Sequence, residues 1–356
     1  MNRKILLPLC ALASLALSFA HPAQAWVDDY KITLSSPADV DSRRAQLIRF
    51  IWGPGGFPTD VSELMPEGPS PIAGLENLAR VEHLQTPMAG SPVGTVVVSS
   101  YHFIPVHSRN RLVVVHYGHT CSVNFNAEGD GLKPTIKALL MDGYGVLASL
   151  MPFSEGQCQY KHDMLFGSLQ DESNRPWHYF FEPLAKSLNY IARQYPAYRD
   201  FSMVGLSGGG WATTLYAAID PRIRTSFPVA GSIPLYMYSA NYQTDAEQSR
   251  ADLYSQAGYP DLYLLGSVGR GRRQIQVLNH SDRCCFGARQ HVRHLPHVSS
   301  DFDSAVRGYE TRVQSALTKL GTGSFRVVIF DIDGHLIPED VLRNVILSTL
   351  DANDGR

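Results

Sequence analysis

The sequence has no marked excess of charge of either sign. Its 31 lysines and arginines nearly balance its 33 aspartates and glutamates, and the formal net charge is −2 at pH 7. A surface that holds nucleic acid or an anionic membrane needs a strong positive field, and this balance does not indicate one. We therefore expect no nucleic-acid partner and no attachment to a charged lipid surface.

Long apolar runs are lacking after the first residues of the chain. Residues 1–25 begin with Arg3 and Lys4, continue in an apolar run and end in the small-residue pattern Ala23-Gln24-Ala25. These features are typical of a cleaved signal peptide, and the apolar run is too short for a comfortable membrane span. The sequence predicts an exported protein, periplasmic or extracellular, that begins near Trp26.

The rest of the chain divides into an irregular part and a regular part. Residues 26–92 lack a clear repeating pattern, and we interpret them as an N-terminal extension packed on the main domain, with a short helix at 42–52 and an early strand within 73–88. From residue 93 to the C-terminus, apolar strands alternate with amphipathic helices. The strands are expected at 93–106, 112–116, 144–150, 200–206, 225–231, 274–279 and 325–332, and the helices at 131–141, 176–195, 208–219, 301–320 and 338–350. This alternation predicts an α/β domain whose mainly parallel sheet is covered on both faces.

The stretch from residue 200 to 211 combines a short strand, a Gly-x-Ser-x-Gly turn and the start of a helix. A turn of this kind places the serine hydroxyl at the carboxyl end of the strand. It forces unusual backbone angles on Ser207 and brings neighbouring atoms close, so Gly205 and Gly209 must be small. The pattern predicts that Ser207 is a nucleophile. The alternative is a glycine-rich turn whose serine only caps the helix, because such a turn can have the same sequence.

A serine hydroxyl needs a base to take its proton, and the base needs an orienting carboxylate. The strand 274–279 runs into a loop that presents Asp282, and the last strand runs into a loop that presents His335. Both loops are expected at the sheet edge that bears Ser207. Asp333 is the rival carboxylate. The other histidines of this region are expected at the surface, without a metal site: His280, His291, His294 and His297.

The stretch from Val113 to Thr120 offers a loop after an early strand, where a backbone N–H can bind an oxyanion. This loop, the Gly-x-Ser-x-Gly turn (the nucleophile elbow) and the loops that carry Asp282 and His335 together make the chain from residue 93 onward resemble the α/β-hydrolase superfamily of serine hydrolases. The resemblance implies a doubly wound, mainly parallel sheet of about eight strands. It also implies that Gly208 and either His119 or Gly118 donate to the oxyanion. The second donor stays open because Tyr117, rather than histidine, precedes Gly118.

Residues 232–271 interrupt the predicted alternation between two core strands. The segment is rich in tyrosine: Tyr236, Tyr238, Tyr242, Tyr254, Tyr259 and Tyr263. We interpret it as a small cap that helps to wall the substrate pocket, with a purely structural insertion as the alternative. Three arginines near its end are candidates for contact with an anionic substrate, or form a solvated charge cluster: Arg270, Arg272 and Arg273.

Cysteine is scarce, with five residues in the whole chain. Four of them follow the signal peptide: Cys121, Cys158, Cys284 and Cys285. An even number in an exported chain indicates disulfide bonds. In the fold that the chain resembles, the loops that carry Cys121 and Cys158 are neighbours, which favours a bridge between them. Cys284 and Cys285 then bond to each other, unless each pairs with one of the other two or stays a free thiol.

These features together predict an exported serine hydrolase that cleaves carboxylic esters, such as acetyl or other short acyl esters, through an acyl-enzyme on Ser207. The expected substrate is a small-molecule or carbohydrate ester, and no metal or organic cofactor is implied. A peptidase of the prolyl-oligopeptidase type is one alternative, although such enzymes usually carry a large extra domain. The other is a non-catalytic binding protein on the same fold, which has no need for an intact set of catalytic residues.

Overall fold

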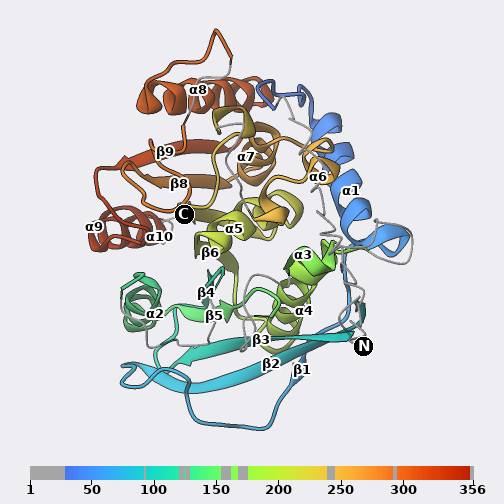
Figure 1. The fold of residues 1–356 in the computed structure, drawn as a ribbon. Helices are drawn as coiled ribbons and strands as arrows, with labels where there is room; N and C mark the ends of the chain where they lie inside the picture. The colour runs from blue at the N-terminus through green and yellow to red at the C-terminus, as the bar shows by residue number, and fades with distance from the viewer. Residues whose placement is uncertain are drawn as a thin grey trace, which may run out of the picture.

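The structure is a computed structural model that describes residues 29–91, 94–119, 125, 129–153, 162–166, 175–238, 245–291 and 295–352. Within these residues nine strands form one sheet, in the order β1-β2-β3-β5-β4-β6-β7-β8-β9 (Figure 1). The strands are β1 (Glu63–Leu64), β2 (Leu78–Ser91), β3 (Gly94–Pro105), β4 (Arg111–His116), β5 (Gly145–Ser149), β6 (Asp200–Leu206), β7 (Ile223–Val229), β8 (Arg273–Asn279) and β9 (Ser324–Phe330).

The six strands from β5 to β9 in this order run parallel to one another, as the sequence predicts. β4, β5 and β6 are buried along nearly their whole length. Strands covered on both faces need apolar side chains on both, which explains why their sequences are continuous apolar runs rather than alternating patterns. The carboxyl ends of these strands meet at one edge of the sheet, where Ser207 follows β6.

Helices cover both faces of the sheet (Figure 1). They are α1 (Pro37–Trp52), α2 (Leu132–Met141), α3 (His162–Leu165), α4 (His178–Gln194), α5 (Gly208–Ile219), α6 (Ala251–Tyr254), α7 (Tyr259–Ser267), α8 (Phe302–Leu320), α9 (Glu339–Val341) and α10 (Ser348–Asp351). Short 3₁₀ helices are η1 (Gly53–Gly55), η3 (Leu235–Met237) and η4 (Ala246–Gln248), and η5 (Leu342–Leu347) is a π-helix between α9 and α10. In Figure 1, α2, α9 and α10 lie on one side, and α4, α5 and α7 lie on the other. This is the doubly wound α/β arrangement predicted from the sequence.

The N-terminal region is a part of the sheet rather than an extension packed on it. β2 pairs with β3 in antiparallel register over most of its length, and β1 pairs with β2. The predicted boundary at residues 92 and 93 therefore falls between two strands that pair with each other, β2 and β3. Because β1, β2 and β3 add an antiparallel flank to the parallel strands, the sheet has nine strands instead of about eight. The helix expected at 42–52 begins earlier, at Pro37, because Ser36 and Asp39 form a capping box at its start.

The segment 232–271, predicted to be a cap, contains a regular element of the fold. Its helix α7 packs against α5, α8 and β8, as the crossover helix between β7 and β8. Tyr254, Tyr259 and Tyr263 are buried completely, and Tyr263 stacks on Phe325 of β9. These three rings build the core instead of walling a pocket. Among the described residues of this segment, only those up to Gly258 lie outside the alternation of strand and helix, and Tyr242 lies outside the described residues.

No helix in the described part of the chain combines the length and the apolar character that a membrane crossing requires.

Candidate active site

Ser207 occupies a sharp turn between the end of β6 and the start of α5. Its backbone has φ 59° and ψ −126°, a conformation that L-residues rarely adopt. The turn is held from both sides: the Ser207 N–H donates to the carbonyl of Val229 (3.0 Å), and the Ser207 carbonyl accepts from the N–H of Trp211 (2.9 Å). A strained residue that its neighbours hold in place is a reasonable candidate for function.

The glycines around Ser207 are required by close backbone approach, as the sequence predicts. A Cβ atom on Gly205 would collide with the carbonyl of Gly209, one turn further on in α5. A Cβ atom on Gly209 would collide with the carbonyl of His116 at the end of β4. The elbow therefore packs directly on the backbone of the neighbouring strand, with no space for side chains between them.

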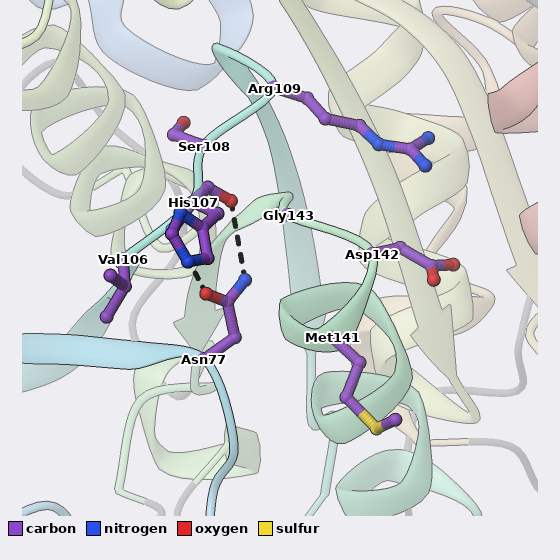
Figure 2. Close-up of a pocket in the computed structure, with 8 residues that line it drawn as sticks. All are labelled: Asn77, Val106, His107, Ser108, Arg109, Met141, Asp142 and Gly143. Carbon is purple, nitrogen blue, oxygen red and sulfur yellow. Dashed lines mark hydrogen bonds between the residues drawn. The ribbon is translucent and has the colours of Figure 1, made fainter.

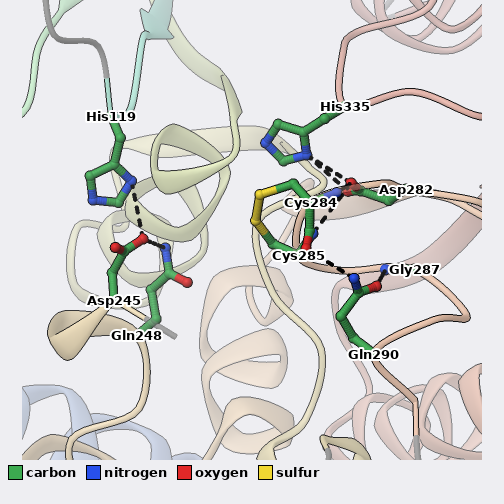
Figure 3. The surroundings of a disulfide bond; sticks show 9 residues. All are labelled: His119, Asp245, Gln248, Asp282, Cys284, Cys285, Gly287, Gln290 and His335. Atoms are coloured by element: carbon green, nitrogen blue, oxygen red, sulfur yellow. Dashed lines mark hydrogen bonds and ion pairs between the residues drawn. A yellow bond between two sulfur atoms is a disulfide. The ribbon is translucent and has the colours of Figure 1, made fainter. Parts of the chain in front are cut away.

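Asp282 and His335, predicted to be partners, lie together (Figure 3). Asp282 follows β8 and His335 follows β9. His335 Nδ1 donates to the carboxylate of Asp282, at 2.9 Å to Oδ2 and 3.1 Å to Oδ1. Asp282 is completely buried, and its Oδ1 also accepts from the backbone N–H of Cys284 at 2.7 Å. The carboxylate is therefore fixed before it orients the imidazole.

Asp333 has a different partner. Its carboxylate accepts from Nε of Arg283 at 2.6 Å and pairs with the same guanidinium through its second oxygen. Both side chains are well exposed, and hydrogen bonding to Arg283 together with its charge lowers the pKa of Asp333. Of the two candidate carboxylates, only Asp282 contacts His335 among the described residues.

The second ring nitrogen of His335 remains available. Nε2 is buried and makes no hydrogen bond with any described residue, and none joins it to Ser207. Catalytic hydrogen bonds are often loose before substrate binds and tighten in the reacting complex. The arrangement therefore leaves His335 with one nitrogen held by Asp282 and one free to take a proton.

A neighbouring histidine bears on the choice between Gly118 and His119 as the second oxyanion donor. The Gly118 N–H donates to Nδ1 of His116 at 3.2 Å, so it is occupied. Burial, together with the charge of nearby His119, lowers the pKa of His116 to about 3, and the neutral ring can accept this bond. Without substrate, Gly118 is therefore less available as an oxyanion donor than a free N–H, and both Gly118 and His119 stay predicted donors. The N–H of Gly208 is the first of α5 and has no acceptor within the helix.

Two buried residues beside His119 were missed in the sequence analysis. Nε2 of His119 lies 2.6 Å from Glu247 Oε1, and Nδ1 of His162 lies 3.2 Å from the same oxygen. Burial disfavours the charged ring of His119, but the carboxylate of Glu247 outweighs it and raises the pKa of His119. Burial also opposes the charged form of Glu247, yet the two histidines lower the pKa of Glu247 overall. No local sequence pattern joins these residues, because their separations along the chain are large.

Cys284 and Cys285 form a disulfide bond with each other, immediately after Asp282 (Figure 3). The sequence left three states open for these two cysteines, and the structure has the bond between them. This bond excludes a disulfide from either residue to Cys121 or Cys158, and it excludes free thiols at both positions. Cys121 and Cys158 lie outside the described residues, so a bridge between them stays a prediction.

The arginines considered for an anionic substrate lie at the wrong edge of the sheet. Arg273 begins β8, whereas the candidate site lies at the carboxyl ends of the strands. Arg272 is buried, and its guanidinium donates to four backbone carbonyls, including Ile223 and Leu265. It holds helix ends in the core and is neither a substrate contact nor part of a solvated cluster.

The histidines expected at the surface do not form a metal site in the described part of the chain. His291 is partly buried instead, with one ring nitrogen 3.3 Å from the carbonyl of Met237 and the other 2.9 Å from that of Ser299. His297 packs edge-on against Tyr30. His294 lies outside the described residues.

An open hollow of about 870 Å³ lies at the opposite end of the strands (Figure 2). It is lined by Asn77, Val106, His107, Ser108, Arg109, Met141, Asp142 and Gly143. These residues come before β4 and β5, at the amino ends of the parallel strands, so the hollow is remote from Ser207. Asn77 donates to the carbonyls of Leu140 (2.7 Å) and His107 (3.3 Å), which indicates a structural turn rather than a second reaction site.

Comparison with known proteins agrees with this fold. No protein-family model matches the sequence, and a search of curated proteins finds no match. A CE15 glucuronoyl esterase from Teredinibacter turnerae aligns with a TM-score of 0.54 at 12% identity, over 88% of this chain and 85% of its own. An S-formylglutathione hydrolase from Agrobacterium tumefaciens aligns with a TM-score of 0.52 at 12% identity, over 83% and 99%. The likeness confirms the predicted α/β-hydrolase fold.

Proposed function

We propose that the protein is a serine hydrolase that cleaves carboxylic esters through an acyl-enzyme on Ser207. The observation that carries this proposal is the positive-φ Ser207 at a strand-to-helix junction, on the same sheet edge as the Asp282–His335 pair. The order serine, aspartate, histidine along the chain is the order that this fold uses. The structures of similar fold described above include an esterase and a hydrolase by name, which supports the same class of reaction.

The reaction begins when Ser207 Oγ attacks the ester carbonyl carbon and Nε2 of His335 takes the hydroxyl proton. The buried carboxylate of Asp282 stabilises the imidazolium that results. The carbonyl oxygen becomes an oxyanion and accepts hydrogen bonds from the backbone N–H groups of Gly208 and His119. When the carbon–oxygen bond to the alcohol breaks, His335 gives the proton to the leaving alkoxide, and the acyl group remains on Ser207.

The second half of the reaction uses the same groups with water in place of the alcohol. His335 takes a proton from water as the water oxygen attacks the acyl carbon, and a second tetrahedral oxyanion forms in the same place. Its collapse returns the proton to Ser207 Oγ and releases the carboxylic acid. Each half-reaction returns His335 to its neutral form, so one turnover consumes only the ester and one water molecule.

The choice of ester over peptide rests on the N-terminal region. Ester and amide hydrolysis use the same three residues, so the residues do not separate them. β1 and β2 lie in the central sheet and α1 packs on α5, so these described elements before β3 belong to the same α/β domain as the candidate site. This arrangement supports a small-molecule or carbohydrate ester with a short acyl group.

We expect clear turnover of short-chain aryl esters and little turnover of peptide anilides. The reason is that an amide has a poor leaving group that must be protonated and a peptide needs an extended aligning site. The measurement is kcat/KM on aryl acetate and butyrate beside alanyl and prolyl anilides. A value higher for any anilide than for the acetate would replace the esterase proposal with a peptidase.

We also propose that the chain is exported after cleavage before Trp26, as the pattern of residues 1–25 indicates. The Cys284–Cys285 disulfide is compatible with an oxidising compartment. Expression of the full chain in a secreting host, followed by mass spectrometry of the N-terminus, is expected to find mature protein in the periplasm or medium. Intact protein starting at Met1 in the cytoplasm would contradict the proposal.

A further inference from the structure

Three side chains far apart in the sequence converge next to the candidate oxyanion loop. His119 follows β4, His162 lies on α3 in the connection after β5, and Glu247 lies on η4 in the connection after β7. Each offers one nitrogen or oxygen atom, and the three atoms lie within 4.8 Å of one another. The convergence joins three separate loops at the carboxyl edge of the sheet.

These side chains are almost completely buried. The exposed fractions are 11% for the side chain of His119, 4% for that of His162 and 0% for that of Glu247. Glu247 uses only one of its two carboxylate oxygens, because both histidines contact Oε1. Its Oε2 is buried and has no hydrogen-bond partner among the described residues. A simple buried ion pair would be expected to satisfy both oxygens.

The outer nitrogen of each histidine also has an acceptor beside it. Nε2 of His162 lies 3.0 Å from the carbonyl oxygen of Pro152. Nδ1 of His119 lies 3.5 Å from Oδ2 of Asp245 (Figure 3). Histidines that bind a metal through one nitrogen commonly donate the other N–H to a carbonyl or a carboxylate, which holds the ring and its tautomer. Both rings therefore have the surroundings of a metal ligand.

We propose that His119, His162 and Glu247 bind a divalent transition-metal ion of the zinc type. Two imidazole nitrogens and one carboxylate oxygen are a ligand set that suits Zn²⁺. Bonds of about 2.0–2.1 Å in a tetrahedron separate ligand atoms by roughly 3.3 Å. The observed separations from Glu247 Oε1 are 2.6 and 3.2 Å, so small side-chain movements open the site. A fourth position remains for water.

The ion would act on the candidate active site by positioning, not by taking part in the reaction. The imidazole of His119 lies against the backbone at Gly208, where an added Cβ would be only 2.7 Å from its Cε1 atom. Fixing this ring to Glu247 and His162 fixes the main chain of His119, whose N–H is the proposed oxyanion donor. Metal binding itself does not depend on the proposed hydrolysis, so the two proposals are tested separately.

The test uses mature protein produced in an oxidising compartment, stripped with a chelator and dialysed against ZnCl₂. Metal content per chain is measured by plasma mass spectrometry. We expect one zinc per chain for the native protein and for Ser207→Ala, which removes the nucleophile only. We expect loss of this zinc in His162→Asn and in Glu247→Gln. The matched control is His178→Asn, because His178 and Glu182 form a similar pair at 2.8 Å on α4 outside the cluster.

Cobalt supplies a second readout that does not depend on the variants. Co²⁺ added to the stripped native protein is expected to give the visible absorption of a low-coordinate site, without a thiolate charge-transfer band. The absence of a thiolate band distinguishes this site from a second group of side chains that lie close together, Cys284, Cys285 and His335. The sulfurs of the two cysteines in that group are bonded to each other. Native protein that binds no more zinc than His162→Asn would overturn the proposal and leave a buried ion pair. A thiolate band would do the same by moving the metal to the cysteines.

Discussion

Ser207→Ala is expected to lower kcat for ester hydrolysis on the order of 10⁶-fold, as loss of the nucleophile does in a well-studied serine hydrolase. Alanine leaves the oxyanion donors and the substrate pocket in place but removes the atom that forms the acyl-enzyme. The fold should be retained, since the turn is held by backbone hydrogen bonds to Val229 and Trp211 that alanine also makes. The measurements are kcat on an aryl acetate, labelling by a fluorophosphonate probe and the thermal midpoint.

The control for this variant is Ser281→Ala. Ser281 is also half-buried and lies on the same sheet edge, next to Asp282, but among the described residues its hydroxyl contacts only His280, at 3.4 Å. It is expected to keep both turnover and labelling. If Ser207→Ala kept most of the ester hydrolysis, or was labelled as strongly as the native protein, another residue would be the nucleophile and the proposed function would be wrong.

Asp282→Asn is expected to lower kcat about 10⁴-fold, the loss seen when the orienting carboxylate of a triad becomes an amide. The amide is nearly the same size, so packing changes little. It carries no negative charge to stabilise the imidazolium, and its NH₂ group favours the wrong tautomer of His335. Asp282 is completely buried beside His335, so solvent does not replace the lost interaction.

Asp333→Asn is the matched comparison, because this carboxylate also lies close to His335 in the sequence. It pairs with Arg283 in an exposed position, and exposed ion pairs contribute little. We expect kcat to remain within a few-fold of the native value. Both variants are compared by kcat on one aryl ester and by thermal midpoint. A large loss for Asp333→Asn with a small one for Asp282→Asn would transfer the orienting role to Asp333.

The pattern of strands and turns in the sequence was sufficient to predict the turn at Ser207 and the loops that carry Asp282 and His335. Parallel strands end at a common edge, so loops after consecutive strands meet there whatever their distance in the chain. This is why Asp282 and His335 were placed beside each other without a structure. The glycine positions around Ser207 follow equally from local sterics, because a strand-to-helix turn brings backbone atoms together within a few residues.

Local patterns also misled the interpretation where an element had two possible neighbours. The tyrosines of residues 232–271 suggested a cap, but composition does not say which surface a ring packs on. Tyr263 is buried against Phe325, a residue more than sixty positions later. In the same way, the sequence predicted that β2 belongs to an N-terminal extension. Its place in the sheet depends on pairing with the neighbouring strand β3, which the apolar pattern of β2 alone does not reveal.

The sequence by itself determined the class of fold, the turn that carries Ser207 and the loops that carry its candidate partners, because these depend on the period of apolar residues and on short-range sterics. Only the tertiary structure decided which atoms are free. The Gly118 N–H is taken by His116, Arg272 is enclosed by backbone carbonyls, and Cys284 bonds to Cys285. The meeting of His119, His162 and Glu247 is likewise a product of loop packing, since hydrogen bonding and burial depend on neighbours in space and leave no mark in the local sequence.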